Sequence, residues 1–447
     1  MQAAVGANLV VADAAPHVRA LAALATFERK GQGPKEERTV RFYAPARPTT
    51  TIWLPRGLYP QARRITGIRA IHDRRLVFQK TDLGWRGQLR DYQVPVLQQI
   101  LAQDGGVLKA PTGTGKTEVM LAAVAHWGQP TLWIVDQKDL ARDAQARMRR
   151  LFNLPRNGIG YIGEGAGIEG AGRYITVAMM QTLAKRPDIL EKMQRRIGAV
   201  VTDEVDKTAA ETYARVVTSF PGRYRLGASA TPERTDGLEG LMFAIVGPGY
   251  TEYAYESAFQ SGAIHRPQIH LVGTALSVYG NPEWAEVQRA RASDSGRNVL
   301  ICRLAASARR AGRKVLILAE LKPHTRLLEL LLRKHFGVVA YAVDGEVPAA
   351  KRARVYREAT EGRAVLIATR LGDRGLDLPA IDCLILATPG RSGPRVVQQI
   401  GRVIRRAQGK QNAIVYDICD VNVPTLKAQI PSRLKAYREH GFEVVRR

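Results

Sequence analysis

The sequence predicts an α/β protein in which two tandem domains, each built on a mostly parallel sheet, follow a small α+β domain. Apolar runs suited to buried parallel strands recur along the chain with helical stretches between them. The first series lies at 106–109, 131–136, 197–203 and 224–230. The second series lies at 314–318, 338–342, 364–368, 382–386 and 413–417. A chain of 447 residues is long enough for two or three domains, and we expect them at residues 1–84, 85–250 and 251–447.

Residues 1–84 differ from the rest of the chain in their pattern of apolar, polar and turn-forming residues. They hold one amphipathic helix candidate, 16–28, followed by a polar, charged stretch. Short β-like runs come next at 39–43, 50–54 and 75–78, interrupted by proline and glycine. These features predict the small N-terminal α+β accessory domain. Residues 240–300 are rich in Gly, Pro and Tyr, and we expect them to hold the linker between the two larger domains.

A glycine-rich loop stands between the first apolar strand and a helical stretch. Residues 110–117 read Ala-Pro-Thr-Gly-Thr-Gly-Lys-Thr, and this order of strand, loop and helix is the context of a phosphate-binding loop. Gly113 and Gly115 let the backbone wrap closely around phosphates. Lys116 is expected at the β- and γ-phosphates, and Thr117 offers a hydroxyl to Mg²⁺. The sequence therefore predicts a nucleoside triphosphate site, with a chance glycine-rich turn as the weaker interpretation.

Two adjacent acids stand at the end of the apolar run 197–203. An NTP hydrolase needs one carboxylate that holds the metal and a second that orients the attacking water, and Asp203 and Glu204 supply this pair. Adjacent acids after a strand also occur as solvated loop residues, so the upstream phosphate loop is what favours the catalytic interpretation. At the end of the next strand, Ser229 and Thr231 are candidates to hydrogen-bond the acidic segment, although any Ser/Thr-rich strand end would look the same.

Two closely spaced arginines lie late in the chain. Residues 398–406 read Gln-Gln-Ile-Gly-Arg-Val-Ile-Arg-Arg, so Arg402 and Arg405 stand three apart, which predicts that both lie on one face of a helix. Guanidinium groups spaced in this way suit bidentate contact with a γ-phosphate. A solvated basic helix is the alternative.

The composition is strongly basic. A formal net charge of +26 and a pI near 10.3 favour polyanionic partners, either nucleic acid or an anionic membrane surface, although a generally basic proteome would give the same excess. The cysteines Cys302, Cys383 and Cys419 are too few and too scattered for a disulfide framework or a zinc site, and Cys383 and Cys419 are expected as small core residues. We find no signal peptide and no uncharged run of membrane-spanning length, so we expect a soluble cytoplasmic protein.

The order of these motifs, across residues 85–420, resembles that of the superfamily-2 helicases. Residues 89–93 (Leu-Arg-Asp-Tyr-Gln) resemble the adenine-reading segment, and 110–117 resemble motif I in its AxxGxGKT form. Residues 203–206 (Asp-Glu-Val-Asp) resemble motif II, 229–231 resemble motif III, and 368–377 resemble motif V. Residues 398–405 resemble motif VI, QxxGRxxR. Residues 133–138 and 175–181 occupy the positions of motifs Ia and Ib. The resemblance implies two tandem RecA-like parallel-sheet domains behind a small α+β N-terminal accessory domain, and an ATP hydrolase.

The resemblance also implies roles for individual residues. The nucleotide would be bound by Arg90, Gln93, Thr112, Gly113, Thr114, Gly115, Lys116, Thr117, Gly375 and Asp377. Catalysis would rest on Lys116, Asp203, Glu204, Gln398, Arg402 and Arg405, with Thr117 and Asp203 as metal ligands. Nucleic acid would be contacted by Gln137, Lys138, Thr176, Gln181, Thr369 and Arg370. The implied cofactors are ATP and Mg²⁺, and the two domains would close around ATP and step along a strand as it is hydrolysed.

Three details resemble the XPB/UvsW-type branch, which includes phage helicases that remodel branched DNA. They are the LRxYQ context of Gln93, the sequence ATPxRxDG at 230–237 and the segment 433–442, whereas motif II reads neither DEAD nor DEAH. The implied partner is forked, branched or single-stranded DNA bound without sequence preference, with RNA less favoured and no membrane. Replication, repair or recombination proteins are candidate partners, either near the nucleoid or in the cytoplasm of a phage host. A DNA role for residues 1–84 rests on their position and on Arg63, Arg64, Arg69, Arg74 and Arg75.

Three other functions stay open. The chain could be an RNA helicase, or a duplex-DNA translocase subunit that moves without separating strands. From a different class, it could be a nucleotide-switched nucleic-acid clamp with little turnover. The presence of Glu204, Arg402 and Arg405 argues against the clamp, because a clamp could lose them.

Overall fold

The computed structural model of the protein describes residues 1–29, 39–46, 50–163, 165–206, 210–233, 236–369 and 378–445. The chain divides into two compact units, one formed by residues 1–110 and 115–254 and the other by 111–114 and 255–447. Each unit holds a seven-stranded parallel sheet, and the first unit also holds a small mixed sheet at the N-terminus. The predicted fold class is confirmed as two tandem RecA-like domains with a small α+β domain. In the part of the chain described, no helix has both the length and the apolar character needed to cross a bilayer.

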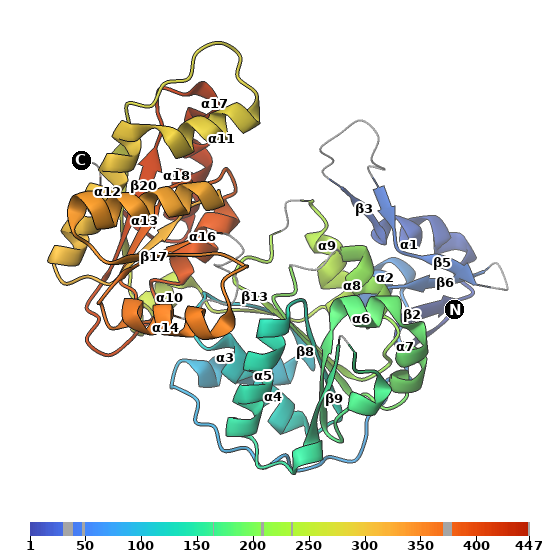
Figure 1. The fold of residues 1–447 in the computed structure, drawn as a ribbon. Coiled ribbons are helices and arrows are strands. Elements are labelled where there is room, and N and C mark those ends of the chain that lie inside the picture. Colours follow the sequence, from blue (N-terminus) through green and yellow to red (C-terminus); the bar gives the residue numbers. More distant parts are fainter. Residues whose placement is uncertain are drawn as a thin grey trace. The chain divides into compact units, whose positions relative to one another are not determined.

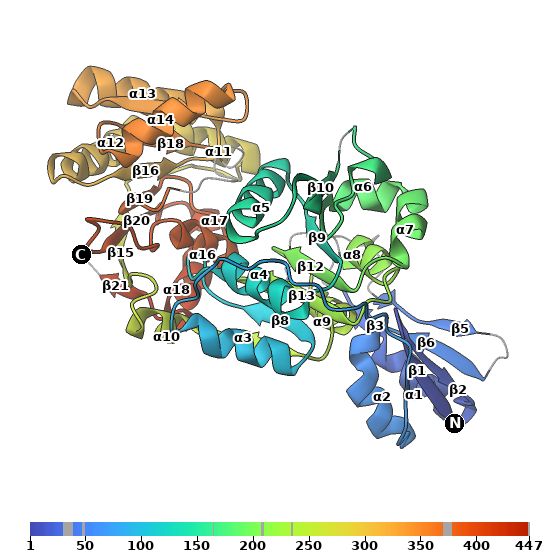
Figure 2. The same cartoon turned by 90° about the horizontal axis from the view of Figure 1, so that it is seen from below.

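The N-terminal domain is a five-stranded sheet with two helices on one face (Figures 1 and 2). Its strands, in spatial order, are β5 (Ala44–Ala46), β6 (Thr51–Leu54), β2 (Leu9–Ala12), β1 (Gln2–Val5) and β7 (His72–Asp73). Every second residue of the central strands is buried in a core shared with η1 (Ala15–His17), α1 (Val18–Leu24), η2 (Arg56–Leu58) and α2 (Tyr59–Thr66). The predicted helix 16–28 is too long, because Thr26–Glu28 forms strand β3 and pairs with β4 (Thr39–Arg41). Phe27 explains the difference, since it packs against the core of the first large sheet.

Two buried arginines fasten the N-terminal domain to the first large sheet. Arg56 donates from Nη1 to the carbonyl of Gly222 at 2.7 Å. Arg225 donates to the carbonyls of Ile245 and Ala7 at 2.7 and 2.8 Å. Burial lowers the pKa of both guanidinium groups, that of Arg225 to about 9, so these carbonyls help to stabilise the buried charge. Hydrogen bonds from these two guanidinium groups to backbone carbonyls therefore join the small domain and the first large sheet within one unit.

The first large sheet is parallel throughout and has helices on both faces. In spatial order its strands are β10 (Ile159–Ile162), β11 (Ile175–Met179), β9 (Thr131–Val135), β12 (Ala199–Asp203), β13 (Tyr224–Ser229), β8 (Gly105–Lys109) and β14 (Tyr250–Glu252). One face packs on α3 (Gln93–Ala102), α4 (Lys116–Trp127) and α5 (Lys138–Leu151), and the other on α6 (Met180–Lys185), α7 (Pro187–Gln194), α8 (Ala210–Val217) and α9 (Glu239–Val246).

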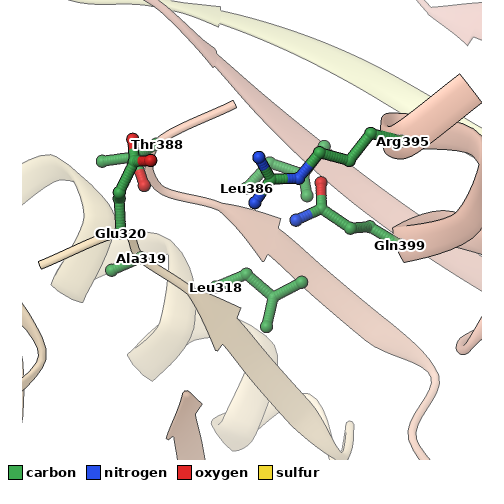
Figure 3. Close-up of a pocket in the computed structure, with 7 residues that line it drawn as sticks. All are labelled: Leu318, Ala319, Glu320, Leu386, Thr388, Arg395 and Gln399. Carbon is green, nitrogen blue, oxygen red and sulfur yellow. The ribbon is translucent and has the colours of Figure 1, made fainter. Parts of the chain in front are cut away.

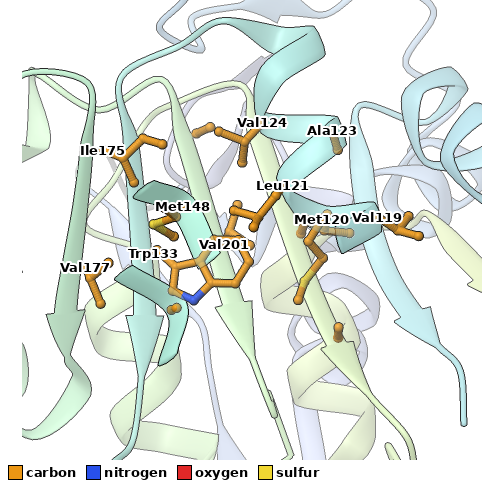
Figure 4. Close-up of a cluster of buried hydrophobic side chains, with 14 of the residues drawn as sticks. Val119, Met120, Leu121, Ala123, Val124, Trp133, Met148, Ile175, Val177 and Val201 are labelled. Atoms are coloured by element: carbon orange, nitrogen blue, oxygen red, sulfur yellow. The ribbon is translucent and has the colours of Figure 1, made fainter. Parts of the chain in front are cut away.

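The central strands of this sheet are largely apolar because both faces are covered. Figure 4 shows Trp133 of β9 in the core beneath α4 and α5, with Leu121 and Met148 around it. The next residues on either side, Leu132 and Ile134, belong to the core on the opposite face. Continuous apolar runs are what a strand buried on both faces requires, and all four runs predicted for this domain form strands.

The second large sheet is also parallel. Its strands, in spatial order, are β17 (Ala340–Val343), β18 (Val365–Ala368), β16 (Val315–Leu318), β19 (Cys383–Leu386), β20 (Ala413–Cys419), β15 (Pro267–Gly273) and β21 (Glu443–Val445). The described helices of this unit are α10 (Tyr255–Gln260), α11 (Trp284–Ser293), α12 (Ser295–Arg310), α13 (Lys322–Phe336), α14 (Ala349–Thr360), α16 (Gly393–Gly401), α17 (Pro424–Lys427) and α18 (Ile430–Glu439). All five predicted strands form, and Cys302, Cys383 and Cys419 are buried and not disulfide-bonded.

The region 240–300 is richer in structure than expected of a linker. It contains α10, α11 and strand β15, which pairs with β20 over seven residues and so lies inside the sheet. Polar residues interrupt the strand at Gln268 and His270. This alternation of polar and apolar side chains hid β15 among the Gly- and Pro-rich sequence around it.

Acidification should destabilise the second unit through His324, which is 1% exposed on α13. Burial lowers its pKa to about 3, and its Nε2 lies 2.8 Å from Asn298 Oδ1. The unfolded chain takes up this proton near pH 6.5, whereas the folded chain does not, so the free energy of unfolding falls as the pH falls below about 6.5. From pH 7.5 to 5.5 we expect a loss of about 1 kcal/mol from this group, measured by hydrogen exchange of the α13 amides. The loss should be absent in a His324→Gln variant, and an equal loss in both proteins would contradict the prediction.

Candidate ATP-binding and nucleic-acid site

The predicted phosphate loop connects the buried strand β8 to the first turn of α4. Gly113 and Gly115 have φ angles of 93° and 80°, a region in which L side chains are strained. Lys116 is 9% exposed, and its ammonium donates to the carbonyl of Ala110 at 3.0 Å. The loop thus curls around the lysine ammonium in front of a helix N-terminus. This is the local geometry that binds phosphate oxygens.

The predicted metal ligands come together at the carboxyl edge of the first large sheet. The hydroxyl of Thr117 lies 3.5 Å from Oδ2 of Asp203, the last residue of β12. Burial raises the pKa of the Asp203 carboxyl, although the positive charge of Lys116 acts the other way. A hydroxyl and a carboxylate oxygen are the hard donors that Mg²⁺ accepts together with substrate phosphates. Thr117 and Asp203 therefore fit the predicted ion.

Glu204 occupies an unusual backbone conformation. Its φ is 51°, in the left-handed region that costs a non-glycine residue about 1–2 kcal/mol. Its N–H donates to Oδ1 of Asp203 at 3.0 Å, which helps to hold the turn. Strain of this kind is concentrated at functional sites, where surrounding contacts enforce it. The turn brings two carboxylates of neighbouring residues to one end of β12.

The predicted link between the acidic segment and the next strand is confirmed for one residue. The hydroxyl of Ser229, which is fully buried, donates to Oδ1 of Asp206 at 2.5 Å. The N–H of Thr231 donates to the same hydroxyl at 3.0 Å. The end of β13 is therefore joined to the acidic segment through Ser229, and a relay of nucleotide state along this path stays a prediction.

Gln93 lies beside the phosphate loop, although 22 residues separate it from Gly115. It is 4% exposed, its side-chain oxygen accepts the N–H of Arg90 at 2.9 Å, and its amide nitrogen donates to the carbonyl of Gly115 at 3.4 Å. A Cβ at position 115 would lie 2.3 Å from that nitrogen. Together with the φ angle of 80°, this close approach favours glycine at position 115.

Tyr253 is a residue of this region that the sequence did not single out. Its ring stacks on Tyr92 with centroids 5.2 Å apart and planes 7° apart. The Tyr92 hydroxyl in turn accepts a hydrogen bond from Arg90 at 3.0 Å. Nothing in the spacing of these residues could have revealed the pair. Nearby, Trp85 packs edge-on against Phe152 at 5.4 Å, as part of the core.

Three of the predicted nucleic-acid residues gather at the carboxyl edge of β9 and β11. Gln137 precedes α5, Lys138 is its exposed first residue, and the Gln181 amide donates to the carbonyl of Asp136 at 2.9 Å. Thr176 differs, because it lies near the amino end of β11, is 2% exposed, and accepts the N–H of Gly172 at 3.1 Å. The buried Thr176 hydroxyl is therefore not accessible in this conformation for the predicted contact with nucleic acid.

In the second unit, Thr369 is buried directly after β18, while Arg370, Gly375 and Asp377 lie outside the described residues. Gln398 lies on α16. The expectation that Arg402 and Arg405 share one helix face is wrong, because α16 ends at Gly401.

The chain leaves the helix because Val403 and Ile404 turn into the core and are fully buried. Arg402 lies in the turn after the helix, and Arg405 forms a backbone bridge with Ile264. Arg402 and Arg405 therefore lie in one short segment that follows α16 and is not helical.

A small pocket, which the sequence also did not predict, opens at the carboxyl ends of β16 and β19. Figure 3 shows Glu320 and Thr388 on one side of it, and Arg395 and Gln399 of α16 on the other. Gln288 of α11 donates a short hydrogen bond to Glu320. The pocket is lined by three separate segments, and of these only α16 carries a predicted site residue, Gln398.

Comparison with known proteins agrees with this geometry. Residues 86–234 match the family described as "Type III restriction enzyme, res subunit", and residues 296–407 match "Helicase conserved C-terminal domain". The D10 protein of Escherichia phage T5, named as a helicase, is 27% identical over 368 residues, which cover 79% of this chain and 75% of that protein. The DNA 3'-5' helicase XPB of Mycobacterium tuberculosis is 26% identical over 348 residues, 75% of this chain and 61% of the relative.

Other relatives are longer than this chain. The Rad25 protein of Haloarcula marismortui is 28% identical over 337 residues, and the match spans 73% of this chain but only 52% of that relative. Among solved structures, the Hef helicase domain of Pyrococcus furiosus has a TM-score of 0.52 at 16% identity, covering 74% of this chain and 95% of the other. The type ISP restriction-modification enzyme LlaBIII has a TM-score of 0.59 at 14% identity, covering 83% and 31%. Both structures share the fold.

The two family matches, the named relatives and the shared fold all converge on one group of proteins. The named relatives are all called helicases, and the second matched family carries the same word in its description. The chain belongs to the superfamily-2 helicases.

Proposed function

We propose that this protein couples Mg²⁺-dependent ATP hydrolysis to movement on DNA, and that it remodels or unwinds forked or branched DNA. The observation that carries the proposal is the meeting of the Thr117 hydroxyl with the Asp203 carboxylate, beside Lys116 and Glu204. In this set the Lys116 ammonium would bind the phosphates, and the Thr117 hydroxyl and the Asp203 carboxylate would hold the metal ion. The Glu204 carboxylate would orient the attacking water. Arg402 and Arg405 are proposed to stabilise the charge that develops on the γ-phosphate. ATP, when bound with Mg²⁺, supplies the phosphoryl group that is transferred to water.

Movement on DNA is proposed from the residues that surround the nucleotide-binding edge. Gln137, Lys138 and Gln181 share the carboxyl edge of the first sheet with Asp203. Contacts from such residues to phosphates carry no sequence information, so binding should be sequence-tolerant and should weaken steeply with salt. The net charge of +26 favours such a polyanion. Replication, repair or recombination is the setting in which forked DNA needs this activity.

Recognition of the fork is assigned, within the proposal, to the N-terminal domain. Arg63, Arg64, Arg69 and Arg74 are exposed there, whereas Arg75 is held by Asp73 at 2.7 Å. Arg56 and Phe27 contact the first large sheet and its core. Deleting residues 1–84 would therefore also uncover the core of that sheet. Point substitutions are therefore the appropriate test of this domain.

A second candidate is a duplex-DNA translocase that does not separate strands. The match of residues 86–234 to a restriction-enzyme family and the fold shared with LlaBIII favour it. The same ATPase domain would serve both activities, so the distinction lies in the preferred DNA.

The test is ATP hydrolysis by the purified chain without nucleic acid and with single-stranded DNA, duplex DNA, forked DNA or single-stranded RNA. We expect the strongest stimulation by forked DNA, and no stimulated turnover in a Glu204→Gln variant. Stimulation by blunt duplex alone, without strand separation, would support the translocase. Stimulation by RNA alone would contradict a DNA function, and flat, near-zero turnover on every substrate would support a nucleotide-switched clamp.

A further inference from the structure

One face of the N-terminal sheet is uncovered by the described residues and carries an aromatic row. The strand register aligns Ala44 with Trp53, Trp53 with Val10, Val10 with Ala4, and Ala4 with His72. Residues paired in this way point to the same side of a sheet, and strands are about 4.8 Å apart, so the row spans roughly 19 Å. We call these five residues the Trp53 row.

The opposite face of the same strands fixes which way the row points. Ala3, Leu9, Val11, Ile52 and Leu54 alternate with the row, and each is at most 4% exposed in the core beneath α1 and α2. Trp53, by contrast, is 46% exposed, Ala44 and His72 are also exposed, and Val10 and Ala4 between them are half-buried. The Trp53 row therefore faces away from the helices.

The chemistry of the row is unusual for a solvent-facing sheet. An antiparallel sheet with one wet face normally alternates apolar residues inside with polar residues outside. Here the row consists of a tryptophan, a histidine and three small apolar residues. The small neighbours leave room beside the indole, and a flat aromatic surface on an open sheet is a form that stacks unpaired nucleobases.

The charge around the row favours a polyanion over an apolar protein surface. Exposed basic residues among the described part of residues 1–84 are Arg19, Arg41, Arg63, Arg64, Arg69, Arg74 and Lys80, and the exposed acids are Asp13, Glu28, Asp73 and Asp82. Of the basic residues, Arg19, Arg63 and Arg64 lie on α1 and α2, which cover the opposite face. Arg69 and Arg74 flank β7, the strand that carries His72. Asp73 on that strand is held by Arg75.

We propose that the Trp53 row is a stacking platform for unpaired bases of single-stranded DNA. This inference rests on the proposed function, and it names what the N-terminal domain recognises at a fork: the exposed bases, with Arg69 and Arg74 beside their phosphates. Since Arg56 and Arg225 fix the domain to the first unit, the platform would hold the strand on the same body that binds ATP.

The test is the affinity of the full chain for labelled oligothymidine and for blunt duplex, measured by fluorescence anisotropy at one salt concentration. Trp53→Ala should weaken oligothymidine binding about 5- to 100-fold, the range expected for loss of one stacked base, and should leave duplex binding unchanged. Trp53→Phe should retain most of the affinity, because a phenyl ring still stacks. Trp284→Ala is the matched control, since Trp284 is 51% exposed in the second unit, and it should change neither affinity.

A second measurement does not depend on the folding of the alanine variant. Oligothymidine should protect a tryptophan of the natural chain from acrylamide quenching, and this protection should be missing in Trp53→Phe. If Trp53→Ala and Trp284→Ala bind oligothymidine with equal affinity, the proposal is overturned, and a protein partner becomes the remaining occupant of the row. An equal loss on oligothymidine and duplex would overturn it as well.

The outcome is separable from that of the proposed motor. If the natural chain shows DNA-stimulated ATP hydrolysis while Trp53→Ala binds normally, the platform fails and the motor stands. If oligothymidine binding depends on Trp53 but no DNA stimulates hydrolysis, the motor fails and the platform stands.

Discussion

Replacing Glu204 by Gln should lower the rate of ATP hydrolysis by at least about 100-fold, in the range expected when a general base is lost. The amide has nearly the shape of the carboxylate but cannot accept a proton from the attacking water. The backbone turn at φ 51° should persist, because the N–H that donates to Asp203 is unchanged. Lys116, Thr117 and Asp203 also remain, so the affinity for ATP with Mg²⁺ should stay close to that of the natural chain. Steady-state hydrolysis and binding of a fluorescent ATP analogue measure the two quantities.

Glu191→Gln is the matched control for that variant. Glu191 is exposed on α7, outside the nucleotide-binding edge, so the same chemical change there should leave hydrolysis intact. Turnover by Glu204→Gln above a tenth of the natural rate would show that another group activates the water. Loss of nucleotide affinity in the same variant would instead assign Glu204 to binding.

Arg433→Met should destabilise the second unit by about 3–5 kcal/mol, the cost of leaving a buried charge without its partner. Arg433 of α18 forms two hydrogen bonds with Asp417 of β20, at 2.9 and 3.0 Å. Their side chains are 3% and 0% exposed. The Tyr437 hydroxyl also donates to Asp417, at 2.8 Å, but a neutral donor replaces only part of the lost interaction. Hydrogen exchange of the β20 amides measures the change.

A surface ion pair on the same helix supplies the control. Lys435 Nζ and Glu439 Oε1 are 3.7 Å apart, and the two side chains are 76% and 56% exposed. Solvent-exposed ion pairs contribute about 0–1 kcal/mol to the free energy of unfolding. Lys435→Met should therefore change the exchange rates little. If both variants exchange alike, the buried pair does not stabilise the sheet in the way that its geometry indicates.

The fold could be predicted from the sequence where each strand is buried on both faces. Runs such as 132–135 and 383–386 are apolar at every position, and they lie in β9 and β19. The prediction failed where polar residues alternate within a strand, as in β15, and where a short strand follows a helix, as at Thr26–Glu28. In both places the neighbours that stabilise the strand are far away in the sequence.

The sequence predicts the candidate nucleotide site to a similar degree and for a related reason. A phosphate loop and an acidic pair are contiguous in the chain, so Lys116, Thr117, Asp203 and Glu204 were found by their spacing. The stacking of Tyr92 on Tyr253, the contact of Gln93 with Gly115 and the burial of Thr176 depend on side chains brought together by the sheet. The end of α16 before Arg402 depends on a core that buries Val403 and Ile404.

The sequence by itself determined the two parallel sheets, the phosphate loop and the acids at the end of β12, because each is encoded in residues that are close together along the chain. Only the tertiary structure decided how Arg402 and Arg405 are presented, which residues accompany Gln93, and that Trp53 is exposed in a row of residues across five strands. The physical reason is the same in each case. Hydrogen bonds, stacking and burial act between neighbours in space, and strand register sets those neighbours among residues as distant as Ala4 and His72.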